Sequence, residues 1–136
     1  SGPLLDRIDL HVEVPRVTAA EISGLGRGEP TAAVAARIAA ARELQFERQG
    51  RANTRLDGAC VLEFARTDAA AMSLLGTAMQ RLALSGRAYH RVLRVARTIA
   101  DLAGSAMTRA EHVAEAVTLR QLDRRSGSEP LGTISA

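Results

Sequence analysis

The fold is decided by residues 85–103, which read SGRAYHRVLRVARTIADLA. At about 100° per residue, the apolar side chains of this stretch fill one broad arc of a helical wheel. The opposite arc carries Arg87, His90, Arg91, Arg94, Arg97, Thr98 and Asp101. Ser85 is a suitable N-cap residue and Gly104 a suitable terminator. The stretch therefore predicts an amphipathic helix that packs against other helices through its apolar arc.

The arginines of the polar arc admit two interpretations. In the first they form a solvated face whose partners lie on neighbouring helices, such as Glu111 or Glu115, and such surface pairs contribute little stability. In the second they form a surface for phosphate, because a guanidinium matches phosphate oxygens in a bidentate fork. Arg87 lies in the first turn, where the positive end of the helix dipole adds to its charge. The residues alone leave both interpretations open.

Three further helices are predicted, at residues 31–49, 69–82 and 108–123. Residues 50–66 carry turn residues and are expected to be irregular. The chain is therefore expected to be mainly α, with about four helices. The predicted N-caps are Thr31, Asp68 and Thr108, the last with Glu111 completing a capping box.

The N-terminal part of the chain is different. Residues 8–14 alternate apolar and polar side chains, which is typical of a β-strand. The only candidate partner is a short run at residues 61–64. Because an isolated strand leaves its backbone groups unpaired, we expect this one to belong to a sheet of a larger protein. Residues 16–30 are rich in glycine and are expected to be a linker, and residues 126–136 a disordered tail.

The charge composition excludes some chemistries. The chain has 136 residues, with 18 basic residues against 15 acidic ones and a net charge of +3, and every basic residue is arginine. Without lysine, the chain cannot form a Schiff base or the phosphate-binding loop of the P-loop NTPases. The modest net charge gives by itself no argument for nucleic acid.

Membrane and metal functions are not expected. The apolar runs are shorter than the ~18–20 residues that a membrane span needs, and no secretory signal is visible. We therefore expect a soluble, cytoplasmic protein. The single cysteine, Cys60, excludes an internal disulfide and a cysteine-based metal site. The histidines His11, His90 and His112 lack the spacing of metal ligands.

Two segments closely resemble one family. Residues 1–11, which read SGPLLDRIDLH, resemble the segment leading into the last strand of the AAA+ ATPase core in the magnesium-chelatase/MCM branch. Residues 85–102 resemble the C-terminal lid motif of the ComM/YifB group. The resemblance covers residues 1 to about 125. Its other matching positions are Arg37, Ala41, Arg42, Gln45 and Arg48 in the first lid helix, and residues 112–116 with Arg120 in the last.

The resemblance implies a division of the chain and two site residues. Residues 1–15 would be the end of the ATPase core, and residues 31–125 the helical lid. Arg7, in the LLDRID motif, would be an arginine finger that reaches the γ-phosphate held by the neighbouring subunit. Arg87 would be the sensor-2 arginine that the lid donates to the nucleotide. Both roles place positive charge where the phosphoryl-transfer transition state accumulates negative charge.

The roles of Arg91, Arg94 and Arg97 stay open. The resemblance is compatible with pairing inside the lid, with a subunit interface and with contact to DNA. Two other classes of function are also open: a stand-alone nucleic-acid-binding module that uses the stripe Arg87–Arg97, and a structural interaction domain that binds acidic partners.

For the whole protein, the resemblance implies ATP with Mg²⁺, a hexameric ring, and DNA remodelling by a helicase that promotes branch migration during natural transformation. The Walker A and Walker B motifs would lie upstream, in the ATPase core of the same protein. This chain alone is therefore not expected to be catalytic. Nothing in its sequence indicates a porphyrin site.

Overall fold

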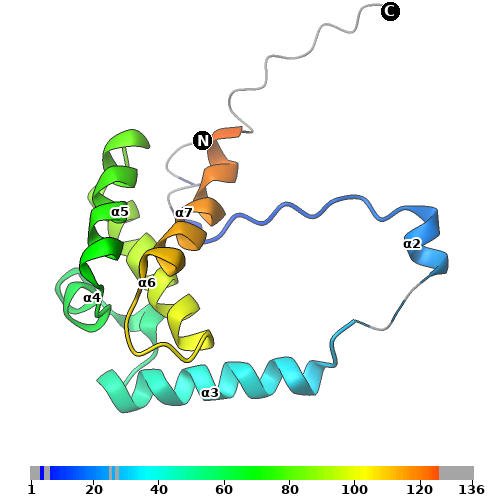
Figure 1. Ribbon diagram of the computed structural model, residues 1–136, viewed down its shortest axis with the longest axis horizontal. Coiled ribbons are helices and arrows are strands. Elements are labelled where there is room, and N and C mark those ends of the chain that lie inside the picture. The colour runs from blue at the N-terminus through cyan, green and yellow to red at the C-terminus, as the bar shows by residue number, and fades with distance from the viewer. Residues whose placement is uncertain (1–3, 5–6, 25, 27, 126–136) are drawn as a thin grey trace, which may run out of the picture.

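The computed structural model describes residue 4, residues 7–24, residue 26 and residues 28–125 of the chain (Figure 1). The protein is mainly helical, which confirms the predicted fold class. The predicted disordered tail, residues 126–136, lies outside the described residues. The helices are α2 (Ala19–Ser23), α3 (Thr31–Gln49), the 3₁₀ helix η1 (Asn53–Arg55), α4 (Gly58–Phe64), α5 (Ala69–Arg81), α6 (Gly86–Leu102) and α7 (Ala110–Arg125).

Helix α6 is the centre of the fold. It contacts α7, α3, α4 and η1, and α7 also packs against α5. Figure 1 shows α4 to α7 gathered in one group, with α3 crossing one end of it. Because α6 has neighbours on several sides, it is buried beyond the apolar arc that the sequence predicted. The hydrophobic core consists of Leu56, Val61, Ala65, Ala71, Leu75, Ala78, Val92, Leu93, Ala96, Val113, Ala116 and Val117.

The ends of three helices follow the prediction. Asp68 Oδ1 accepts a hydrogen bond from the N–H of Ala71 at 2.7 Å, and Ser85 Oγ accepts one from the N–H of Ala88 at 3.1 Å. Each bond satisfies one of the N–H groups that the first turn of a helix leaves unpaired. Gly50 ends α3 with a φ of +71°, a left-handed conformation that glycine adopts without strain.

The prediction that residues 50–66 are irregular is wrong, because they contain η1 and α4. Asp57 is the N-cap of α4 and accepts a hydrogen bond from the N–H of Cys60 at 3.2 Å. Val61, a candidate for the second strand, lies in α4 and is buried in the core. A helix of 7 residues is too short to show a helical period in the sequence, and its packing against α6 stabilises it.

The strand predicted at residues 8–14 is not formed. The N–H of His11 donates to the carbonyl of Leu119 in α7 at 2.9 Å, and Arg120 Nη1 donates to the carbonyl of Ile8 at 3.3 Å. No second strand lies beside this segment in the part of the chain that the structure describes. Without a partner the segment cannot pair its backbone groups as a strand does, and it stays largely exposed.

The capping-box pattern predicted Thr108 as the N-cap of α7, and this prediction is wrong. Thr108 Oγ1 donates to the carbonyl of Ala65 at 2.5 Å, and its N–H donates to the carbonyl of Arg66 at 3.0 Å. Helix α7 begins after Arg109, whose N–H donates to Nδ1 of His112 at 3.0 Å. Thr108 is buried and bonded to the connection between α4 and α5, a tertiary contact that a local pattern does not reveal.

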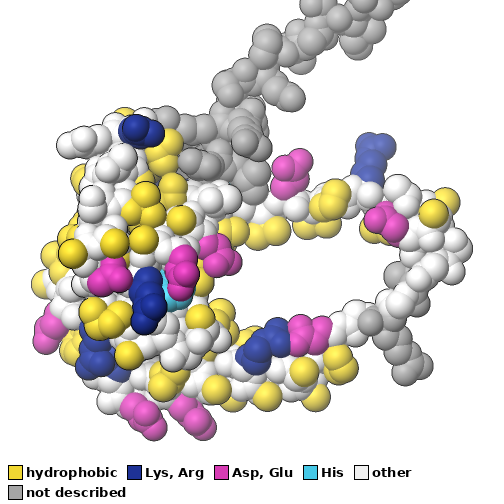
Figure 2. Space-filling model, viewed as in Figure 1, with side chains coloured by type: hydrophobic (Ala, Val, Ile, Leu, Met, Phe, Trp, Pro, Cys, Tyr) yellow, Lys and Arg dark blue, Asp and Glu magenta, His cyan; other side chains and the backbone are white. Residues whose placement is uncertain are grey.

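Helix α3 extends beyond the group formed by α4 to α7. Its buried residues, Ala41 and Gln45, lie in its C-terminal half. Residues 12–24 lead away from the other helices, and residues 28–30 lead into α3. Figures 1 and 2 show residues 12–24 and α3 separated by an open space.

The predicted linker contains one short helix. Thr18 and Glu21 form a capping box at the start of α2. Helix α3 then begins with Pro30 as its N-cap, and the predicted cap Thr31 is its first residue. Proline fits this position because its φ is fixed in the required range and it lacks the N–H that would stay unpaired.

Two leucines in helices test the location of the core. Leu75 in α5 has an exposed fraction of 0%, whereas Leu62 in α4 is 50% exposed. Leu75→Ala is expected to lower the free energy of unfolding by about 2–5 kcal/mol, because it leaves a cavity. Leu62→Ala, the matched control, is expected to change it by less than about 1 kcal/mol. Urea denaturation followed by circular dichroism measures both, and equal losses would place the core elsewhere.

Candidate functional site

Arg97, expected on a solvated or ligand-binding face, is a buried side chain with an exposed fraction of 1%. Its Nε and Nη2 lie 3.1 and 2.9 Å from Oδ1 of Asp101. Its Nη1 donates to the carbonyls of Ala65 and Ala106, and its Nη2 to that of Ser105. The guanidinium is therefore occupied inside the domain and offers no surface to DNA or to a neighbouring subunit.

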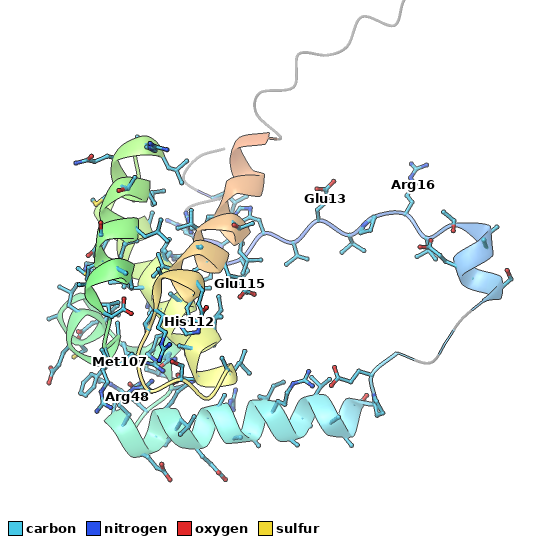
Figure 3. All side chains as sticks on the ribbon, in the orientation of Figure 1. Glu13, Arg16, Arg48, Met107, His112 and Glu115 are labelled. Atoms are coloured by element: carbon cyan, nitrogen blue, oxygen red, sulfur yellow. The ribbon has the colours of Figure 1, made fainter. Side chains whose placement is uncertain are left out.

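Asp101 is shared by two arginines from different helices. Arg48, near the end of α3, donates from Nη1 to Oδ1 of Asp101 at 2.7 Å and from Nη2 to Oδ2 at 3.0 Å. Figure 3 shows Arg48 on the side of α3 that faces the other helices. The side chains of Arg48 and Asp101 are both buried. Bidentate bonds of this kind are among the strongest polar interactions in proteins, so this carboxylate joins α3 to α6.

Burial shifts the ionisation of Arg97. The loss of water lowers the pKa of Arg97 below its ordinary value, the Asp101 carboxylate opposes this shift, and the Arg48 guanidinium adds to it. Arginine nevertheless stays charged in proteins. Two buried cations therefore depend on one carboxylate and on the backbone carbonyls around them.

Asn53 connects η1 to the same carboxylate. Its Nδ2 donates to Oδ2 of Asp101 at 2.9 Å. Its Oδ1 accepts from Arg48 Nη2 at 2.9 Å and from Gln49 Nε2 at 2.8 Å. Its backbone N–H donates to Oε1 of Gln45 at 2.8 Å. We refer to Arg48, Asn53, Arg97 and Asp101 as the buried charged cluster.

Arg94 and Arg91 are half-buried and bind other parts of the domain. Arg94 Nη1 donates to the carbonyl of Leu56 at 3.2 Å. Arg91 Nη1 lies 3.0 Å from Oδ1 of Asp9 and so holds the N-terminal segment against α6. The polar arc of α6 is therefore not a continuous basic stripe on the surface.

The acidic residues expected to pair with this arc lie elsewhere. Glu111 is 3.6 Å from Nε2 of His112, and Glu115 is exposed on α7 (Figure 3). Neither forms an ion pair with an arginine within the described residues. The partners of the arginines are instead Asp9, Asp101 and backbone carbonyls.

Arg87 and Arg7 are the predicted site residues whose guanidinium groups are exposed. Arg87 lies in the first turn of α6, after the N-cap Ser85. Arg7 is exposed as well, and its backbone N–H donates to the carbonyl of Leu4 at 3.1 Å. Neither side chain makes a hydrogen bond or ion pair with any residue that the structure describes. Both remain available to a ligand or a partner.

The buried charged cluster was not predicted as a unit. Arg97 and Asp101 lie four residues apart in a helix, a spacing that suggests a pair. The sequence gives no sign that Arg48 and Asn53, far away along the chain, would share Asp101. That arrangement requires the approach of α3 and η1 to α6.

Metal sites and membrane spans are absent from the part of the chain that the structure describes. Among residues 7–24 and 28–120, no three His, Cys, Asp or Glu side chains come together in a way that could hold a metal ion. None of the described helices combines the length and the apolar character needed to cross a membrane.

The fold and these arginines define an all-α domain organised around a buried carboxylate. The chain belongs to the family of the magnesium chelatase subunit ChlI C-terminal domain, which matches residues 28–120. This result confirms the family that the sequence resembles.

Known relatives agree with this assignment. The chain is 40% identical over 125 residues to the competence protein ComM of Haemophilus influenzae and 44% identical over 126 residues to the uncharacterized protein YifB of Escherichia coli, each time over 91% of this chain. It is 41% identical over 129 residues to the uncharacterized protein Rv2897c of Mycobacterium tuberculosis, over 92% of this chain. Each alignment covers 25% of the relative, so the chain spans about a quarter of their length.

The shared carboxylate makes Asp101 a sensitive position. Asp101→Asn keeps the shape of the side chain but leaves two buried guanidinium groups without a counter-charge. We expect the free energy of unfolding to fall by about 3–5 kcal/mol.

The matched control is Glu29→Gln, which breaks the exposed ion pair between Glu29 and Arg37 and should cost less than about 1 kcal/mol. Urea denaturation measures both variants. A loss below about 1 kcal/mol for Asp101→Asn would contradict the role assigned to the cluster.

Proposed function

We propose that this chain is the C-terminal lid of an AAA+ ATPase, which closes over ATP held by the upstream core of the same protein and couples hydrolysis to subunit movement. The observation that carries the proposal is the contrast within α6. Arg91, Arg94 and Arg97 are engaged inside the domain, whereas Arg87 is exposed and without a partner among the described residues.

Arg87 is suited to contact a nucleotide phosphate. It lies at the N-terminal end of a helix of 17 residues, where unpaired N–H groups and the helix dipole favour an anion. Its guanidinium can donate two parallel hydrogen bonds to phosphate oxygens. In the proposed mechanism Arg87 is the sensor-2 residue, and its charge stabilises the negative charge that develops during phosphoryl transfer. ATP and its Mg²⁺ would be bound by the part of the protein that precedes this chain.

Arg7 is proposed as an arginine finger that acts on the ATP of a neighbouring subunit. Because Arg7 is exposed, its guanidinium can contact a nucleotide bound by another subunit. The ion pair between Asp9 and Arg91 ties the segment that bears Arg7 to α6. A movement of the lid would therefore be transmitted to the finger, and nucleotide state in one subunit would be coupled to contacts with the next, in a ring that we propose to be hexameric.

We propose DNA as the substrate of the whole protein, which would act as a helicase that remodels DNA during natural transformation. Support comes from the relative in Haemophilus influenzae, which is called a competence protein. A stand-alone nucleic-acid module built on the stripe Arg87–Arg97 is less well supported, because Arg97 is buried and Arg91 and Arg94 are half-buried.

The substitution Arg87→Ala in the full-length protein tests the sensor role. We expect kcat for ATP hydrolysis to fall by roughly 10²–10³-fold, the effect of losing one donor to transition-state charge. The control is Arg81→Ala, which removes another exposed arginine from the end of α5 and should leave kcat within twofold. A steady-state phosphate-release assay gives both values, and an unchanged kcat for Arg87→Ala would refute the sensor role.

Mixed rings test whether Arg7 acts in trans. Subunits with Arg7→Ala have an intact ATP pocket but no finger, and subunits that lack the Walker A lysine have a finger but no pocket. Each is expected to be inactive alone. Mixing them should restore ATP turnover, because one type supplies the finger and the other the pocket. Turnover that stays absent over all mixing ratios would exclude action between subunits.

A further inference from the structure

Phe46 is unusual among the aromatic residues of this chain. The sequence contains Phe46, Phe64 and Tyr89 and no tryptophan. Phe64 and Tyr89 pack against the hydrophobic core, whereas Phe46, in the last turn of α3, is 54% exposed. Leaving half of such a side chain in water forgoes stabilisation that burial would give. An exposed aromatic ring in a domain with so few of them indicates a contact surface.

Phe46 belongs to an open pocket of about 480 Å³ that is lined by Arg51, Ala52 and Arg55 as well. No carboxylate lines this pocket. Arg55 makes no side-chain hydrogen bond or ion pair with a described residue. The pocket therefore combines one aromatic ring with two cations.

The guanidinium of Arg51 is bonded inside the domain through only one of its nitrogens. Its Nη2 donates to Sγ of Cys60 at 3.2 Å, which leaves its other N–H groups free for a ligand. Asp57, the N-cap of α4, accepts from the N–H of Cys60; its hydrogen bonds with Cys60 lower its pKa, and the charge of Arg51 adds to this shift. Glu47 lines a different pocket, beside Arg48 and Asp101. Asp57 therefore offsets part of the charge of Arg51, whereas Arg55 has no ion pair with a described residue.

The buried charged cluster holds this pocket in shape. Gly50 turns the chain at the end of α3 with a φ of +71°. Asn53 then fixes η1 through its bonds to Arg48, Asp101 and Gln45. These constraints place Arg51 and Arg55, which lie on either side of Asn53 in the sequence, beside Phe46. The pocket is thus formed before any ligand binds, which lowers the entropy cost of binding.

We propose that the pocket formed by Phe46, Arg51 and Arg55 binds single-stranded nucleic acid. A base stacks on the ring of Phe46, and the guanidinium groups of Arg51 and Arg55 bind the adjoining phosphates. Aromatic stacking combined with basic side chains is the usual way in which proteins bind single strands without strong sequence preference. An acidic peptide would use the arginines but would gain little from the exposed ring, so the ring favours nucleic acid.

This inference rests on the proposal that the whole protein acts on DNA, and it adds the residues that contact a single strand. It assigns the contact to α3 and η1 rather than to the arginines of α6. Binding to a single strand is measured without ATP, so its outcome is independent of the loss of kcat expected for Arg87→Ala. A failure of one proposal can therefore be told from a failure of the other.

Fluorescence anisotropy with labelled (dT)₂₀ and (rU)₂₀ tests the contact, on the 136-residue chain and on the full-length protein. Phe46→Ala is expected to raise Kd about 5- to 150-fold, the range given by loss of one stacked base. Leu44→Ala removes another partly exposed apolar side chain of α3 and should leave Kd within twofold. Equal effects of the two substitutions would overturn the proposal.

The salt dependence of binding tests the arginines. Arg51→Ala with Arg55→Ala should reduce the slope of log K against log salt concentration by about 1.4, or about 0.7 for each lost phosphate contact. Arg81→Ala should leave the slope unchanged. A slope that the double variant does not alter would exclude phosphate contacts at this pocket.

The absence of tryptophan offers a direct probe. Phe46→Trp is expected to keep the affinity, and bound bases should quench the fluorescence of its indole by stacking on it. Binding without quenching would show that the bases lie elsewhere. Competition by poly-glutamate as effective as competition by unlabelled (dT)₂₀ would assign the surface to acidic peptides and overturn the proposal.

Discussion

The structure depends on one buried carboxylate. Asp101 is the common acceptor for Arg48 of α3, Arg97 of α6 and Asn53 of η1. Two arginine side chains can be buried only if their charge is compensated, and the carboxylate and the backbone carbonyls supply this compensation. An apolar contact could bring the same helices together, but the forked geometry of the guanidinium groups also fixes their orientation. Asp101 therefore determines how α3 and η1 lie on α6.

This constraint links the two surfaces to which we assign functions. On α6 it withdraws Arg97 from the surface, while Arg87 at the start of the same helix is exposed. On α3 and η1 it places Arg51 and Arg55 beside Phe46. If the lid is rigid between Arg87 and the Phe46 pocket, a movement of Arg87 that follows the nucleotide state also moves a single strand bound at that pocket. Residues 28–120 belong to the family of the magnesium chelatase subunit ChlI C-terminal domain, and we propose that the ATP pocket lies in the part of the protein that precedes this chain.

Local features were predictable from the sequence, whereas tertiary ones were not. The helices α3, α5 and α6 and the caps Asp68 and Ser85 follow from apolar periodicity and side-chain chemistry next to the helix. The exposure of Arg87 agrees with its place on the polar arc. Arg97 lies on the same arc but is buried, because α3 and the segments that carry Ala65, Ser105 and Ala106 enclose its guanidinium. The role of Thr108 and the sharing of Asp101 likewise depend on segments distant in the sequence.

A double-mutant cycle between Arg48 and Asp101 tests most directly whether this carboxylate joins α3 to α6. The free energies of unfolding of the unmodified chain, Arg48→Ala, Asp101→Ala and the combined variant give the energy of interaction between the two side chains. The account predicts a favourable coupling of about 2–3 kcal/mol, because both groups are buried and bonded by two hydrogen bonds. A coupling below about 0.5 kcal/mol would show that the two positions act independently and would contradict it.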